Sequence, residues 1–65
     1  MGHGKTILII DRAKDVREFC RLVLEPRGYR VVAAASGKEG QRLASSESLD
    51  LVVLDIAKEE AEAGM

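Results

Sequence analysis

The stretch Thr6-Ile7-Leu8-Ile9-Ile10-Asp11 decides the fold, because five β-branched or aliphatic residues run without a break into a carboxylate. An apolar run without polar alternation is typical of a strand that is buried on both faces at the centre of a parallel sheet. The later stretch Leu49-Asp50-Leu51-Val52-Val53-Leu54-Asp55-Ile56 is again nearly all aliphatic, with an aspartate near its end. We therefore predict strands at Thr6–Ile10 and Leu49–Ile56.

The segment after the first strand has a helical pattern from about Lys14 to Arg27. Apolar residues recur there at helical spacing and form one stripe that we expect to face the sheet. The members of this stripe are Val16, Phe19, Cys20, Val23 and Leu24. Pro26 cannot donate to the helix ladder and Gly28 accepts a positive φ, so the helix should end between them.

The middle of the chain predicts a second strand at Tyr29–Ala34 and a second helix from Gly37 to about Ser45. Ser36 and Glu39 form a capping box at the start of that helix. Strands that alternate with helices pair in parallel through right-handed crossovers. If the last strand lies beyond the first, the strand order is 2-1-3 and the two helices cover opposite faces.

Composition excludes several classes of protein. The chain has 65 residues, enough for one domain, with 46% hydrophobic residues and a net charge of −1. The chain has no excess of basic residues and few aromatic residues, so binding to nucleic acid or to a membrane surface is not expected. No apolar run is long enough to span a bilayer. The only cysteine is Cys20 and the only histidine is His3, so neither a disulfide nor a Cys/His metal cluster is expected. The N-terminus lacks the apolar core of a signal peptide, and we expect a cytoplasmic protein.

Asp11 and Asp55 are the candidate site. In open α/β sheets, ligands bind at the carboxyl ends of the strands, beside a switch in strand order. Two carboxylates that converge there can hold a hard cation such as Mg²⁺, and a carboxylate beside the cation can accept a phosphoryl group. The alternative from spacing alone is that both aspartates simply end strands and begin turns.

Five blocks in order make most of the chain similar to a response-regulator receiver domain, from roughly Lys5 to Ile56. The blocks are Ile7–Asp11, Asp15–Arg17, Leu24–Tyr29, Ala34–Gly40 and Leu49–Ile56. The resemblance implies a flavodoxin-like fold and places Asp55 at the phospho-acceptor position of a phosphoprotein. It also implies Mg²⁺ ligands at Asp11, at Asp55 and at the backbone carbonyl of Ala57.

Three departures from the family pattern limit this function. Arg12 stands where the family has the second member of its acidic pair, and a guanidinium cannot ligate Mg²⁺. If the Arg12 side chain points inward, it would form an ion pair with Asp11 or Asp55 in place of the metal. If it points outward, the Mg²⁺ site still lacks one carboxylate ligand. The segment Ala57–Glu62 replaces the usual Pro-Gly loop, and the 65 residues do not include the family's later switch Ser/Thr and Lys.

These observations lead us to expect a single truncated receiver-like domain over residues 1–65, with a tail at 57–65 that is helical or frayed. It would act in two-component phosphorelay signalling mainly by protein association, not as an enzyme, with weak or no phosphorylation and weak Mg²⁺ binding. The run Val52–Leu54 would be an open edge, and we expect a homodimer that forms through this strand, which would complete the sheet, or through the bare face of the sheet. A histidine kinase or a receiver-like protein is the other expected partner. The alternatives are a phosphorylation-competent receiver that uses Asp55 with Mg²⁺, and an excised fragment with no independent function.

Overall fold

The computed structural model describes residues 3–54, so Asp55 and the predicted tail at 57–65 lie outside the described residues. Its elements follow the order β1 (Thr6–Ile10), α1 (Lys14–Leu24), η1 (Glu25–Arg27, a 3₁₀ turn), β2 (Arg30–Ala34), α2 (Gly37–Ser46) and β3 (Leu51–Leu54). Strands and helices alternate as the sequence predicts.

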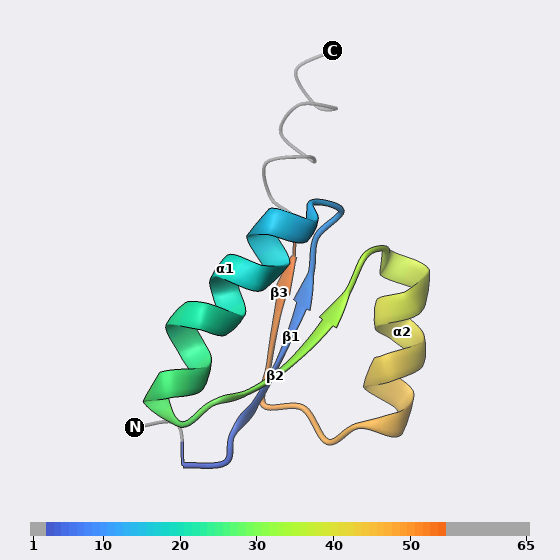
Figure 1. Ribbon diagram of the computed structural model, residues 1–65. Helices are drawn as coiled ribbons and strands as arrows, with labels where there is room; N and C mark the ends of the chain where they lie inside the picture. The colour runs from blue at the N-terminus through green and yellow to red at the C-terminus, as the bar shows by residue number, and fades with distance from the viewer. Residues whose placement is uncertain (1–2, 55–65) are drawn as a thin grey trace.

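The three strands form one parallel sheet in the order β2-β1-β3, which confirms the predicted 2-1-3 topology. In the register, Leu8 of β1 lies opposite Val32 of β2 and Val52 of β3. The sheet lies between α1 and α2, which cover opposite faces (Figure 1). This is part of a flavodoxin-like fold, and β1 is its central strand.

The core is centred on β1. Leu8 and Ile9 are 1% and 2% exposed, respectively. Successive side chains of a strand point to opposite faces, so β1 contributes to both layers. On the face of α1, Ile7 and Ile9 form a buried cluster with Val31. The partly buried residues that pack on this cluster are Cys20, Leu24 and Tyr29. Cys20 is therefore a core residue, as its place in the apolar stripe predicts.

The face of α2 depends on a close approach at Gly40. A Cβ atom added to Gly40 would lie 2.3 Å from Cδ1 and 2.9 Å from Cγ1 of Ile10. The missing side chain lets the backbone of α2 sit directly on the end of β1. The predicted capping box at the start of α2 is confirmed, since the Glu39 N–H donates to Ser36 Oγ and the Ala35 N–H donates to Glu39 Oε1.

Helix α1 ends where its apolar stripe ends, before the predicted end between Pro26 and Gly28. It stops at Leu24 and continues as the 3₁₀ turn Glu25–Arg27, because Pro26 has no N–H for the α-helical ladder. Gly28 then adopts a φ of 92°, as predicted for the residue that ends this segment.

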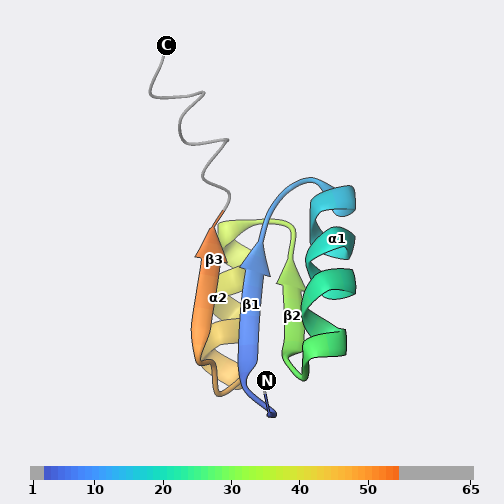
Figure 2. The same ribbon diagram turned by 90° about the vertical axis from the view of Figure 1, so that its left-hand side faces the viewer.

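The predicted apolar stripe of α1 is only partly correct. Phe19 is 65% exposed and Val16 is 41% exposed. The cause is the position of the helix: α1 lies beside β2, at the side of the sheet away from β3 (Figure 2). Only the part of the stripe that faces β1 and β2 is covered.

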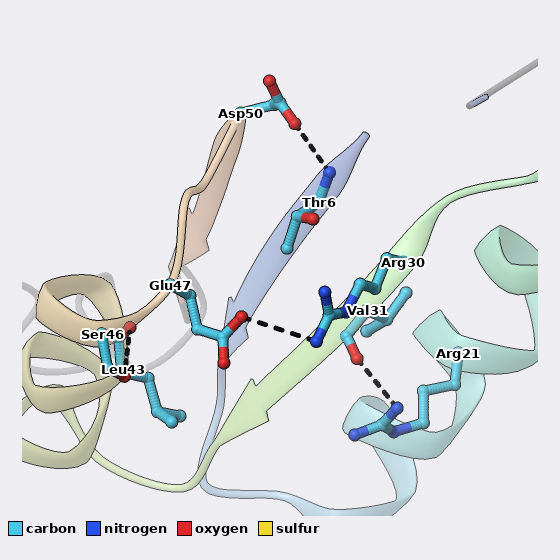
Figure 3. A network of polar contacts seen from close by, with 8 residues as sticks. All are labelled: Thr6, Arg21, Arg30, Val31, Leu43, Ser46, Glu47 and Asp50. Atoms are coloured by element: carbon cyan, nitrogen blue, oxygen red, sulfur yellow. Dashed lines mark hydrogen bonds and ion pairs between the residues drawn. The ribbon is translucent and has the colours of Figure 1, made fainter. Parts of the chain in front are cut away.

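Strand β3 begins at Leu51, two residues later than predicted, because Asp50 anchors the start of the strand. The Asp50 carboxylate accepts the Thr6 N–H at 2.7 Å (Figure 3). The Asp50 N–H in turn donates to the Thr6 carbonyl at 2.8 Å. The four residues of β3 are all exposed, Leu51 at 55% and Val53 at 38%. Within the described residues, β1 is the only strand that pairs with β3, and the open edge at Val52–Leu54 stays a prediction.

Candidate functional site

Asp11 lies at the carboxyl end of the central strand, where the sequence predicts the site. Its N–H donates to the Ala34 carbonyl at 3.0 Å, which continues the contact between β1 and β2 by one residue. Its carboxylate Oδ1 accepts the Ala13 N–H at 2.8 Å. The side chain is half-buried. One oxygen of Asp11 therefore accepts a hydrogen bond within the loop that leads into α1, as expected for an aspartate that begins a turn. The same bond fixes the carboxylate at the edge of the sheet.

Arg17 holds the same loop from the other side, a role that sequence reasoning missed. Its Nη1 atom donates to the backbone carbonyls of Asp11 at 2.8 Å and of Arg12 at 3.1 Å. The sequence places Arg17 only on the polar side of a helix, and no local motif marks an arginine that reaches back to loop carbonyls. The carboxyl edge of β1 is thus a fixed structure, built by Asp11 from one side and by Arg17 from the other.

Strand β3 runs toward the same edge. The last described pair in its register is Ile10 with Leu54, and the next residues in sequence are Asp11 and Asp55. Asp55 and Ala57 themselves lie outside the described residues, so their roles as phospho-acceptor and metal ligand stay predictions. The parallel pairing of β1 and β3, on which those predictions depend, is present.

Arg12 is exposed. Within residues 3–54 it forms no ion pair with Asp11, so the inward arrangement with that carboxylate is not adopted. Mg²⁺ prefers several oxygen ligands, often one or two carboxylates. Across the described residues, no group of three acidic, histidine or cysteine side chains gathers in one place. The described residues alone therefore do not fit a complete Mg²⁺ site.

A shallow hollow lies elsewhere, over the start of α2. It is lined by Ser36, Lys38, Glu39 and Arg42. Ser36 and Glu39 are already used to cap the helix, and Glu39 also pairs with Arg42 at 3.9 Å. This hollow is thus explained by the capping of α2, and the aspartate corner remains the candidate site.

The model of one protein family, described as the response regulator receiver domain, matches residues 7–62. The chain belongs to this family. It is therefore a receiver domain of two-component signalling. Receivers generally act as non-enzymatic signalling modules, they interact with histidine kinases and other receivers, and they typically bind Mg²⁺ at the phosphorylation site.

Curated relatives support the same family. The chain is 40% identical over 50 residues to the response regulator SaeR of Staphylococcus epidermidis. The matched region covers 77% of the chain and 21% of SaeR. It is 39% identical over 54 residues to the CAI-1 autoinducer sensor kinase/phosphatase CqsS of Vibrio cholerae, covering 83% of the chain and 8% of that protein. For the alkaline phosphatase synthesis regulator PhoP of Bacillus subtilis the identity is 36% over 53 residues, 82% of the chain and 22% of PhoP.

The chain thus spans at most 22% of the length of these three relatives. No solved structure gives a significant match. Neither helix among the described residues is long and apolar enough to cross a membrane.

Proposed function

We propose that this receiver works mainly through protein association, with weak or no phospho-acceptor activity at Asp55. The observation that carries the proposal is the corner at the end of β1. Asp11 offers a carboxylate whose Oδ1 already accepts the Ala13 N–H, and the neighbouring position holds the exposed, permanently charged Arg12. Phosphoryl transfer depends on positioned cations, and a missing carboxylate weakens the site that would hold Mg²⁺.

Association with another chain is supported by the edge strand β3. The four residues of β3 are apolar, exposed and at the edge, and such edges pair readily with another chain. We propose that the chain forms a homodimer and that a histidine kinase or a receiver-like protein is a further partner. The balanced charge supports a cytoplasmic protein that binds neither nucleic acid nor membranes.

Phosphorylation is tested by incubating the chain with acetyl phosphate and Mg²⁺ and measuring its intact mass. The unmodified chain is expected to gain little or no phosphoryl mass. Arg12→Asp, which supplies the missing carboxylate, is expected to raise the phosphorylated fraction several-fold, and the double variant Arg12→Asp/Asp55→Asn to lose that gain. Near-complete phosphorylation of the unmodified chain, absent in Asp55→Asn, would instead establish a competent receiver.

Association is tested separately by sedimentation velocity from low to high micromolar concentration. The proposal predicts a concentration-dependent dimer. A folded species that remains monomeric at high micromolar concentration would overturn it.

A further inference from the structure

The apolar residues of β1 and β3 do not by themselves decide which residue of one strand lies opposite which residue of the other. A shift of one residue normally moves the buried side chains of a strand to the wrong face, and this fixes the register of most strands. Residues Leu51–Leu54 are aliphatic at every position, and so are residues Ile7–Ile10 of β1. A shifted β3 would still place aliphatic side chains on both faces, so the register needs another cause.

A polar contact at the start of the two strands supplies this cause. Asp50 immediately precedes β3, and its carboxylate accepts the Thr6 N–H at 2.7 Å (Figure 3). Its own N–H donates to the Thr6 carbonyl at 2.8 Å. One residue therefore binds both backbone groups of Thr6. Because Thr6 is only 6% exposed, a shift that moved Asp50 away would leave a buried N–H without its acceptor, which is unfavourable.

The register also decides which backbone groups of β3 face β1. Even-numbered residues of β1 bond to β3, as the contacts of Thr6 show. In a parallel pair, such a residue bonds to the two residues that flank its partner. Leu8 is the partner of Val52, so it bonds to Leu51 and Val53. The Val53 amide therefore faces β1, whereas the amides on either side of it point away.

The contact between Thr6 and Asp50 is equally far in sequence from the two aspartates of the candidate site. Asp11 follows Thr6 by five positions, and Asp55 follows Asp50 by five positions. The four residues between them are paired one to one in the register. Because each residue of a strand advances by about 3.3 Å, a slip by one residue would displace the acceptor position by the same length relative to Asp11.

We propose that Asp50 sets the register between β1 and β3 and is thereby a positioning residue for the acceptor position, Asp55. This inference deepens the proposed function, because it names a residue on which phosphorylation at Asp55 depends. Asp50 acts through the backbone: it holds the start of β3, and the length of the strand then determines where the acceptor aspartate lies relative to Asp11. A role in stability alone would leave the register unchanged.

Nuclear magnetic resonance of the isotope-labelled chain measures the register directly. In the unmodified chain, the backbone protons of Leu8 should contact those of Val52. Asp50→Ala is expected to weaken this contact at least about twofold and to add contacts from Leu8 to residues one or two positions away, since the native register loses its anchor. Asp50→Asn keeps an acceptor oxygen and should keep the native contact. Asp50→Leu lacks the acceptor but lengthens the apolar run, and it replaces Asp50→Ala if that variant does not fold.

Val31→Ala is the matched control for a loss of stability. It truncates a buried side chain of β2 and touches no contact between β1 and β3. The Val31 carbonyl, which accepts from Arg21 Nη1 at 2.9 Å at the other edge of the sheet, stays in place (Figure 3). This variant should therefore be less stable than the unmodified chain and yet keep the contact between Leu8 and Val52.

The consequence for Asp55 is measured in the Arg12→Asp background, by intact mass after incubation with acetyl phosphate and Mg²⁺ at a temperature where every variant is folded. Adding Asp50→Ala is expected to abolish the increase in phosphorylation that Arg12→Asp produces, because misplacing a reacting group by about 1 Å lowers rates by as much as about 100-fold. Adding Asp50→Asn or Val31→Ala should preserve most of that increase.

An unchanged contact between Leu8 and Val52 in Asp50→Ala, or an equal shift in Val31→Ala, would overturn the inference. A shifted register that keeps the full increase in phosphorylation would overturn it as well. The register is measured without phosphorylation, so it decides the inference even if Arg12→Asp has no effect. Near-complete phosphorylation of the unmodified chain would overturn the proposed weak activity and leave the role of Asp50 intact.

Discussion

Strands β1 and β3 are built from nearly the same residues but have opposite environments. The residues from Thr6 to Ile9 of β1 are at most 6% exposed, whereas those of β3 are between 38% and 55% exposed. Both strands are parallel members of one sheet and are paired with each other. The difference comes from position, because β1 has a strand on each side and helices on both faces, while the helices make their main contacts with β1 and β2. An aliphatic run thus specifies a strand without specifying its burial.

The largest expected effect comes from a matched pair of truncations in the two strands. Leu8 and Val52 are partners in the register and point to the same face. Leu8→Ala should lower the free energy of unfolding by about 2–5 kcal/mol, because Leu8 is fully buried. Val52→Ala should lower it by less than about 1 kcal/mol, since Val52 is 44% exposed. Urea unfolding followed by circular dichroism, at a concentration where the chain is monomeric, measures both; equal losses would contradict the comparison.

The next effect concerns how β3 is attached to β1. Asp50→Ala removes the acceptor of the Thr6 N–H, and Thr6 is only 6% exposed. Leaving this donor without its partner should cost about 1–3 kcal/mol in the same urea experiment. Asp50→Asn keeps an oxygen at the same place and should cost less. If Asp50→Ala were as stable as the unmodified chain, this anchor would not hold the start of β3.

A smaller effect on stability is expected from Gly40, where α2 packs closely on β1. Gly40→Ala gains about 1 kcal/mol of helix propensity, but its Cβ atom overlaps Ile10, and such overpacking costs about 1–3 kcal/mol. We expect a net loss of about 1 kcal/mol. Gly37→Ala is the matched control, because a Cβ atom there meets nothing within 4 Å, and it should be neutral within about 0.5 kcal/mol. Equal thermal midpoints for the two variants would argue against close packing at Gly40.

The smallest effect on stability should come from Arg21→Met, which makes the edge of β2 resemble that of β3. The ion pair with Glu25 is exposed, so its loss should cost less than about 1 kcal/mol. The Val31 carbonyl is freed, however, and the sheet then has two uncharged edges. Sedimentation should detect species larger than a dimer, because pairing at both edges does not close. A size distribution unchanged from the unmodified chain would mean that Arg21 does not protect this edge.

Most of the fold was predictable, because each signal acts locally. The run at Thr6–Ile10, the capping box at Ser36 and the pair Pro26 and Gly28 each specify their element through nearby backbone bonds. The exposure of Phe19 was not predictable, since it depends on where α1 lies across the sheet. The same limit applies to Arg21, whose bond to Val31 joins a helix to a strand edge that helical spacing does not reveal.

The candidate site was predictable to a similar degree. The sequence predicts Asp11 at the carboxyl edge because the apolar run of the first strand ends there, and the structure places it there. The bond from the Ala13 N–H to the Asp11 carboxylate agrees with the alternative that this aspartate begins a turn. The sequence does not reveal that Arg17 holds the loop carbonyls, because this contact depends on the path of the turn. The exposure of Arg12 depends on the same path. Asp55 and Ala57 remain predictions.

Amide hydrogen exchange of β3 at two protein concentrations tests the central claim most directly. In dilute monomer, the Val53 amide, which faces β1, should be protected, while the outward amides of Val52 and Leu54 exchange rapidly. At high micromolar concentration, Val52 and Leu54 should become protected as the second copy pairs with them. Equal protection of all three amides in the monomer, or no change with concentration, would contradict an open β3 edge that pairs with a second copy.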